Sequence, residues 1–230
     1  MAGPDSGERL LAPWLRPVPT SEMELMSSHP VLPVLDRLAQ VIGATTPEQD
    51  TAPTPCAGLD VVALRRHLLG GIGYFTLVLT DPDGDQRPDP RAYVGPEQAE
   101  VLVAAIGELS EAVRAALADG VEAVPVRAPA LGGTFSGDYV LSMLVAEAVV
   151  HGWDVARATG QTWRPDPEAS ERAYALLADQ IKPEYRGGVG LPFAPEVPVS
   201  PDAPALDRLL GFAGRSPKWT PTPPPGTEGG

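Results

Sequence analysis

The sequence has little of several residue types on which common protein functions depend. It holds one cysteine, Cys56, and three histidines among 230 residues. A single cysteine excludes an intramolecular disulfide framework and a zinc cluster built from several thiolates. Basic residues are also scarce, since 17 Lys and Arg stand against 30 Asp and Glu and the net charge is −13. We therefore expect neither a nucleic acid nor an anionic membrane surface as a partner, because both attract a basic face.

Long apolar runs are missing as well. No stretch reaches the ~18 uninterrupted apolar residues of a membrane span, and the longest candidate, 68–80, follows two arginines. The first residues, MAGPDSGERL, show neither the basic nor the apolar segment of a signal peptide. These observations predict a cytoplasmic protein, a monomer or homodimer, with a small molecule as its substrate.

Glycine and proline, in contrast, are abundant and unevenly distributed. The chain contains 24 Gly and 28 Pro, and the proline-rich stretches lie towards its two ends. This composition predicts a flexible N-terminal arm over 1–28, a helical domain over 29–220 and a disordered tail over 221–230. With 43% apolar and 20% charged residues overall, the central region can bury a full hydrophobic core.

The spacing of apolar residues predicts a mostly helical domain. Intervals of three and four residues predict helices over 31–42, 60–80, 97–119, 138–159 and 167–181, with a short helical run over 205–212. Asp60 is a good N-cap for the second helix, and Gly160 ends the fourth. The stretch 121–136 changes period and predicts an extended connection with a short strand. The fold class is therefore all-α, with about four core helices and one long crossover.

Three glycines interrupt the second predicted helix, at Gly70, Gly71 and Gly73. Each weakens a helix by ~1 kcal/mol relative to alanine. Glycine at such places indicates the close approach of another helix or of a ligand. The Gly-Gly-x-Gly pattern is not a phosphate loop, because it lacks the strand-to-helix setting and the following Lys-Ser/Thr.

Three ionisable residues share one face of the helix predicted over 138–159. Glu147, His151 and Asp154 stand at positions i, i+4 and i+7. On an Ala/Val-rich inward face such groups are costly unless they are paired or bind a metal. Side chains at i and i+4 can converge on one ion at ~2.0–2.2 Å. A third ligand has to come from another helix, and His67 is the interior histidine that remains.

The set His67, Glu147 and His151 would leave one coordination position open. Three protein ligands and an open position are typical of catalytic zinc sites, and the same set can hold a non-haem iron. The alternative is that the Glu-x-x-x-His spacing arose by chance. In that case His67 is a buried, hydrogen-bonded histidine, and Asp154 forms a surface pair with Arg157 three residues further on.

Two other polar residues have a functional and a structural interpretation. Cys56 stands four residues before the N-cap residue Asp60. A nucleophilic cysteine requires a base or a helix N-terminus nearby, which lowers the pKa of its thiol. It lies in a proline-rich loop without a histidine near it in sequence, so we favour a small buried packing residue. His29 precedes Pro30 at the start of a helix and is expected to be exposed and without function.

Three blocks of the sequence carry a family resemblance. They are TAPTPCAGLDVVALRRHLLGG (51–71), EAVVHGWDVARATGQ (147–161) and PDAPALDRLLGFAGRSPKW (201–219). Together they resemble the actinobacterial metal-binding DinB-like proteins, relatives of mycothiol-dependent maleylpyruvate isomerase. The first block is similar to the family's T-x-C-x-G-W-x-V-x-x-L-x-x-H segment, with Leu59 in place of the usual Trp. The second is similar to its E-x-x-x-H-x-x-D segment.

The resemblance runs from about residue 30 to 220 and implies a DinB-type four-helix bundle. It implies one divalent metal ion held by His67, Glu147 and His151, with zinc expected and nickel or iron as alternatives. Asp154 matches the family's polar residue below the second histidine and is the expected catalytic residue. Tyr74, Met143 and Trp153 are candidate pocket walls, although each is also a natural core residue.

By the same resemblance, the protein is an enzyme of the mycothiol-dependent isomerase or transferase type that acts on a small electrophilic metabolite, with mycothiol as a possible cofactor. The resemblance does not extend to the C-terminal α/β domain of the isomerase, so it does not imply maleylpyruvate isomerisation itself. Two alternatives stay open. One is a thiol-independent Lewis-acid enzyme acting on a natural-product intermediate, and the other is a non-catalytic metal-binding protein.

Overall fold

Four long helices form the centre of the protein. The computed structural model describes residues 29–187 and 193–221, so the expected arm over 1–28 and nearly all of the expected tail lie outside the described residues. The four helices are α2 (Val31–Gly43), α3 (Val61–Thr80), α4 (Ala99–Ala118) and α5 (Gly137–Ala158). Their bounds lie within two residues of those expected from the apolar spacing, and the all-α fold class is confirmed.

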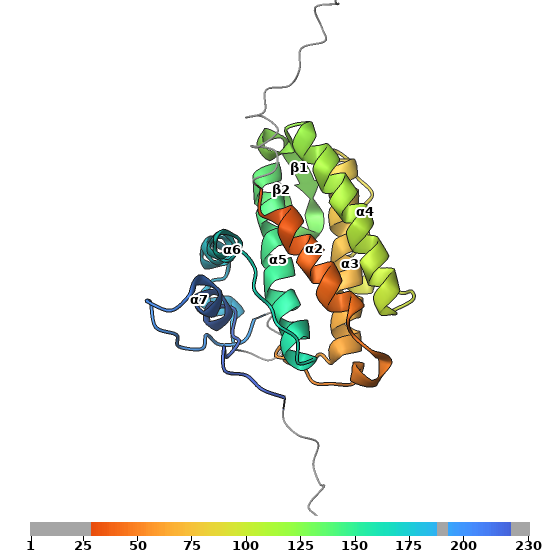
Figure 1. The fold of residues 1–230 in the computed structure, drawn as a ribbon. Coiled ribbons are helices and arrows are strands. Elements are labelled where there is room, and N and C mark those ends of the chain that lie inside the picture. The colour runs from red at the N-terminus through yellow and green to blue at the C-terminus, as the bar shows by residue number, and fades with distance from the viewer. Residues whose placement is uncertain (1–28, 188–192, 222–230) are drawn as a thin grey trace, which may run out of the picture.

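The four helices close into a bundle. Helix α2 packs against α4 and α5, and α3 packs against the same two helices from the other side (Figure 1). The guanidinium of Arg65, near the start of α3, donates to Asp50 after α2 and to the carbonyl of Glu97 just before α4. The first turns of α3 and α4 therefore lie at the same end, and these two helices run parallel. The sequence predicted one long crossover without locating it, and the structure places it at 81–98, between α3 and α4.

A short β-hairpin joins α4 to α5. Strands β1 (Pro125–Ala128) and β2 (Gly133–Ser136) pair antiparallel, with Pro125 opposite Ser136. The loop between them is tied to α3, because the backbone N–H of Ala130 donates to the Tyr74 hydroxyl at 3.1 Å. The extended connection expected from the change of period is thus a two-stranded hairpin. Its last residue, Ser136, caps α5 by accepting from the N–H of Tyr139.

Helix α5 is the most enclosed element of the fold. Helices α6 (Pro167–Gln180) and α7 (Ala205–Phe212) lie outside the bundle, with α6 packed on α5 and α7 on α6 (Figure 1). By length and composition alone α5 is apolar enough to cross a membrane, but 83% of that window is buried inside the protein. This is the pattern of a core helix, and it explains why ionisable residues on α5 need partners.

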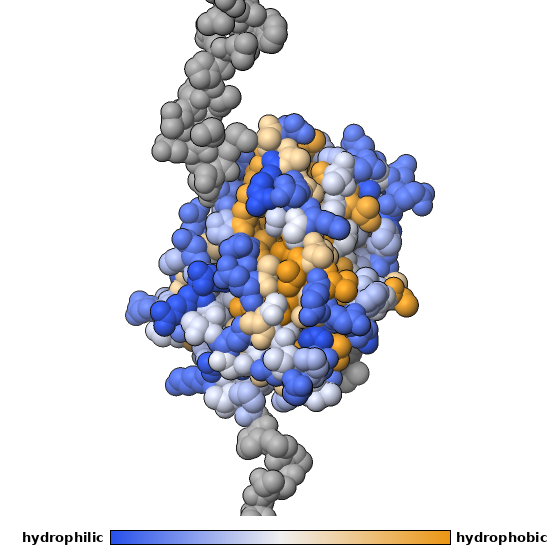
Figure 2. Space-filling view, turned by 45° about the vertical axis from the view of Figure 1, so that its right-hand side comes forward, coloured by the Kyte–Doolittle hydropathy of each residue, from blue (hydrophilic) through white to orange (hydrophobic). Residues whose placement is uncertain are grey.

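Hydrophilic residues cover most of the face shown in Figure 2, and a band of apolar residues runs down its middle. Apolar side chains on a protein surface are normal, since apolar atoms make up more than half of an ordinary surface.

Candidate metal centre

The site is built where α3 and α5 pack side by side. Asp60 begins α3 by accepting from the N–H of Ala63 at 2.8 Å, which places His67 two turns into the helix. Helix α5 runs in the opposite direction and presents Glu147 and His151 one turn apart. The donor atoms of His67, Glu147 and His151 all lie within 4.8 Å of one another. The structure therefore brings together the three residues that the sequence predicted as ligands.

Glu147 lies between the two histidines. Its Oε1 is 2.7 Å from Nε2 of His67 and 3.7 Å from Nε2 of His151. The two imidazole rings meet edge to face, with centroids 4.9 Å apart. Two ring nitrogens and one carboxylate oxygen thus surround a common point, which is the donor set of a catalytic zinc or a non-haem iron site.

A hydrogen bond fixes the orientation of His151. Nδ1 of this ring lies 3.0 Å from Oδ2 of Asp154, whose side chain is completely buried. A carboxylate can only accept here, so Nδ1 donates and Nε2 is the ring nitrogen turned towards Glu147. A metal-binding histidine usually donates its other ring N–H to a carboxylate or a carbonyl, which fixes the orientation of the ring.

Arg215 neutralises the buried carboxylate of Asp154. Its Nη2 lies 3.1 Å from Oδ2, and its Nη1 donates to the carbonyl of Ala213 at 2.7 Å. The alternative pairing of Asp154 with Arg157 is wrong, because Arg157 instead donates to the carbonyl of Trp219. No motif in the sequence points to Arg215. A buried aspartate demands a cation, but with 15 arginines in the chain nothing in the spacing indicates one located 61 residues further on.

The interactions within the group lower the pKa of Glu147 and raise the pKa of His67. Burial would raise the pKa of the Glu147 carboxyl, but His151, His67 and Arg215 together outweigh burial and lower it to about 2. The hydrogen bond from His67 to Glu147 raises the pKa of His67, and burial opposes it. Glu147 is therefore ionised at neutral pH, as a metal-binding carboxylate has to be.

The members of the group differ in their exposure to solvent. The side chain of His67 is 43% exposed and that of Glu147 is 29% exposed, whereas those of His151 and Asp154 are 11% and 0% exposed. Of the expected pocket walls, Tyr74 and Trp153 are buried core residues and Met143 is half-buried. Solvent and small molecules therefore reach the group from the His67 and Glu147 side.

The loop before α3 places Cys56 against the other side of the group. The Thr54 hydroxyl accepts from the N–H of Cys56 at 3.2 Å and donates to the carbonyl of Leu59 at 2.7 Å, while Gly58 adopts a left-handed conformation with φ of 84°. The thiol consequently lies within 4.8 Å of donor atoms of His151 and Asp154. Cys56 is far from His151 and Asp154 in the sequence, so their proximity could not be predicted from it.

The thiol of Cys56 is protonated at neutral pH. Burial raises the pKa of Cys56 to about 11, and the nearby Arg215 opposes that rise without cancelling it. A protonated thiol is a poor nucleophile. These properties favour the packing role over the nucleophilic one.

His29 is not exposed, contrary to the expectation. Only 8% of the residue is accessible, and it lies near two carboxylates, those of Glu122 and Asp138. The N–H of Val31 donates to Nδ1 of His29 at 3.2 Å, so Nε2 carries the proton of the neutral ring. Nδ1 already accepts from Val31, so the ring cannot move its proton from Nε2 to Nδ1 to free Nε2 for a metal, and this second group is the weaker candidate.

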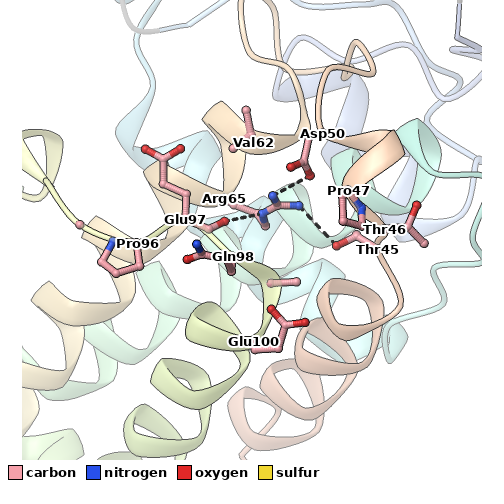
Figure 3. A pocket seen from close by; sticks show the side chains of 12 residues that line it. Thr45, Thr46, Pro47, Asp50, Val62, Arg65, Pro96, Glu97, Gln98 and Glu100 are labelled. Carbon is pink, nitrogen blue, oxygen red and sulfur yellow. Dashed lines mark hydrogen bonds and ion pairs between the residues drawn. The ribbon is translucent and has the colours of Figure 1, made fainter.

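A cavity of about 430 Å³ lies elsewhere, at the end of the bundle where α2 ends and α3 and α4 begin (Figure 3). Arg65 crosses it, and its guanidinium is occupied by the carboxylate of Asp50 at 2.6 Å, the carbonyl of Glu97 at 2.9 Å and the hydroxyl of Thr45 at 3.4 Å. Arg65 is only 4% exposed. It joins three chain segments and has a structural role, and none of the proposed ligands lines this cavity.

Comparison with known proteins identifies the family of the chain. Residues 31–156 match the family model described as the mycothiol maleylpyruvate isomerase N-terminal domain. The chain belongs to this family. The match contains α2, α3, α4 and α5 with all three proposed ligands, and it ends before Arg215.

Two relatives match a longer part of the chain than that domain. Two uncharacterized proteins, from two strains of Mycobacterium tuberculosis, are each 29% identical to the chain over 189 residues, which is 79% of this chain and 93% of theirs. No solved structure matches the chain.

Proposed function

We propose that this protein is a zinc-dependent enzyme of the mycothiol-dependent isomerase or transferase type, which acts on a small electrophilic metabolite. The observation that carries the proposal is the convergence of His67, Glu147 and His151 on one point, with His151 oriented by the buried Asp154. The family supports the connection to mycothiol.

The donor set fits a divalent metal. Two neutral imidazoles and one carboxylate would leave a Zn²⁺ site with one positive charge, so a further anion such as a thiolate is attracted to the open position. A bound metal of this kind lowers the pKa of a thiol or water. The same donors suit nickel or iron, and elemental analysis of the purified protein decides among the three.

The residues of the chain have distinct tasks in this proposal. His67 and Glu147 lie on the exposed side and would hold the metal next to the incoming ligand. Asp154 holds the proton of His151 Nδ1 and keeps Nε2 free for the metal. Because Asp154 is fully buried between His151 and Arg215, its contacts favour a positioning role over direct contact with a substrate.

The reaction class follows from the open position and the thiol. A thiolate held beside an electrophilic carbon supports addition and elimination, thiol transfer or isomerisation, all of which need the electrophile within reach of the sulfur. Mycothiol has to be reduced for such chemistry, which agrees with a cytoplasmic enzyme. We propose a monomer or homodimer with a small molecule as its partner.

The test replaces zinc with Co²⁺, whose absorption reports its ligands. Adding mycothiol to the Co²⁺-loaded chain should produce a sulfur-to-metal charge-transfer band, and a small electrophile should then be consumed. A spectrum that ignores thiols but responds to another metabolite would support the thiol-independent Lewis-acid enzyme. A spectrum that no added ligand alters would support the non-catalytic metal-binding protein.

A further inference from the structure

The three glycines of α3 differ in what surrounds them. At Gly70 a methyl group would overlap the carbonyl of Pro90 in the crossover, so this glycine permits close packing of two segments. Gly73 is exposed, and no described atom outside its own stretch of helix lies within 4 Å of where a Cβ would stand. Gly71 has neither property, and its role has to be found in its own surroundings.

Gly71 borders the candidate metal centre. A Cβ at this position would stand 3.7 Å from Oε1 of Glu147, and apart from the nearby helix backbone no other described atom lies within 4 Å. Gly71 follows His67 by one helical turn, so both residues face α5. A contact at 3.7 Å is an ordinary one, and packing therefore does not require glycine here.

The absent side chain leaves space on the open side of the group. His67 and Glu147 are the two exposed members; Gly71 lies one turn after His67 on α3, and a Cβ there would contact Glu147. A long side chain at residue 71 would extend from a point next to the carboxylate oxygen that would bind the metal. It would occupy the side from which a ligand has to come.

We propose that Gly71 keeps open the approach to the metal and sets the size of the ligand that the site admits. This inference rests on the proposed function and adds a specificity-determining position to it. Glycine lowers the stability of a helix interior relative to alanine, and an approach for substrate is a benefit that offsets this loss.

The neighbours of Gly71 define the chemistry of the admitted ligand. One turn beyond Gly71 on α3 is Phe75, which is buried in the core, and one turn before Glu147 on the antiparallel α5 is Met143, which is half-buried. Both side chains are apolar and cannot satisfy the hydroxyls of a sugar. We therefore expect the part of the ligand that lies over Gly71 to be compact and apolar.

The experiment compares Gly71→Ala and Gly71→Leu with the matched controls Gly73→Ala and Gly73→Leu, which make the same changes to helix propensity at an exposed position. Each full-length variant is loaded with Co²⁺ and titrated with ethanethiol and with benzyl mercaptan. Metal content should be the same in all of them. Gly71→Leu should weaken benzyl mercaptan binding by about tenfold or more and ethanethiol binding less, with Gly71→Ala between it and the wild type.

Three results would overturn the inference while leaving the proposed metal site intact. They are wild-type affinity for both thiols in Gly71→Leu, an equal loss in the Gly73 variants, and loss of the metal itself in Gly71→Leu alone. Failure of the wild-type chain to bind Co²⁺ would instead remove the proposed function, and this inference with it.

Discussion

The carboxylate of Asp154 lies between His151 and Arg215, with Oδ2 3.0 Å from the histidine Nδ1 and 3.1 Å from the arginine Nη2. The aspartate is fully buried, so its charge has to be balanced within the protein. The arginine comes from the segment after α7, outside the residues that match the family domain. The C-terminal part of the chain therefore completes the support of the candidate metal centre.

Replacing Asp154 with Asn should weaken metal binding by about 10–100-fold without abolishing it, because the support of a ligand is lost but no ligand is removed. Asp138→Asn, on the same helix but paired with Arg172 at the surface, is the matched control and should bind metal as the wild type does. Competition with a chromophoric chelator measures both affinities. Complete loss of metal in Asp154→Asn would make Asp154 a ligand instead of a positioning residue.

Replacing Arg215 with Met should destabilise the protein by about 3–5 kcal/mol, because it leaves a buried carboxylate without its cation. The control is Arg114→Met, which breaks an exposed pair with Glu111 and should cost less than about 1 kcal/mol. Urea unfolding of the metal-free variants gives both values. Equal losses of unfolding free energy in the two variants would mean that the buried pair of Arg215 and Asp154 stabilises the protein no more than an exposed pair does.

Acid should destabilise the metal-free protein through Glu147. Its folded pKa of about 2 lies below the ordinary value of 4.5, so its contribution is present above the ordinary value and is lost as the pH falls towards 2. His67 has the opposite sign: its raised pKa contributes below the unfolded value, and that contribution is lost as the pH rises through the folded one. Unfolding free energies measured between about pH 5 and pH 3 should fall less in Glu147→Gln than in the wild type, and parallel curves would contradict the shift.

Cys56 should behave as a packing residue. Because burial raises the pKa of its thiol to about 11, a disulfide reagent at neutral pH should modify it far more slowly in the folded chain than in urea. Cys56→Ala should keep the full metal content. Rapid modification in the folded state, or loss of metal in the alanine variant, would show that the thiol takes part in the site.

The sequence was sufficient to predict the helices and the residues that meet across them. Helical periodicity places Glu147 and His151 on one face regardless of the rest of the chain, and a shortage of other histidines makes His67 the natural third member. Predictions of this kind need only the geometry of a single helix and the small number of histidines in the chain.

The partners of these residues could not be predicted in the same way. The pairing of Asp154 with Arg215 and the position of Cys56 beside His151 depend on how distant segments fold back on α5. Burial of His29 depends likewise on packing, since a histidine before a proline carries no sign of it. The three glycines of α3 show both cases, because their presence indicated close approach but only the structure separates a packing contact from an open approach.

Metal stoichiometry tests the account most directly. The full-length protein, and the variants His67→Ala, Glu147→Gln, His151→Ala and the control His29→Gln, should each be incubated with Zn²⁺, freed of loose metal and analysed by plasma mass spectrometry. The account predicts about one zinc ion per chain in the wild type and in the control, as expected for one three-ligand site, and a sharp loss in each of the other three variants while circular dichroism shows an intact helical fold. Absence of bound metal in the wild type, or full retention in any one of the three ligand variants, would contradict it.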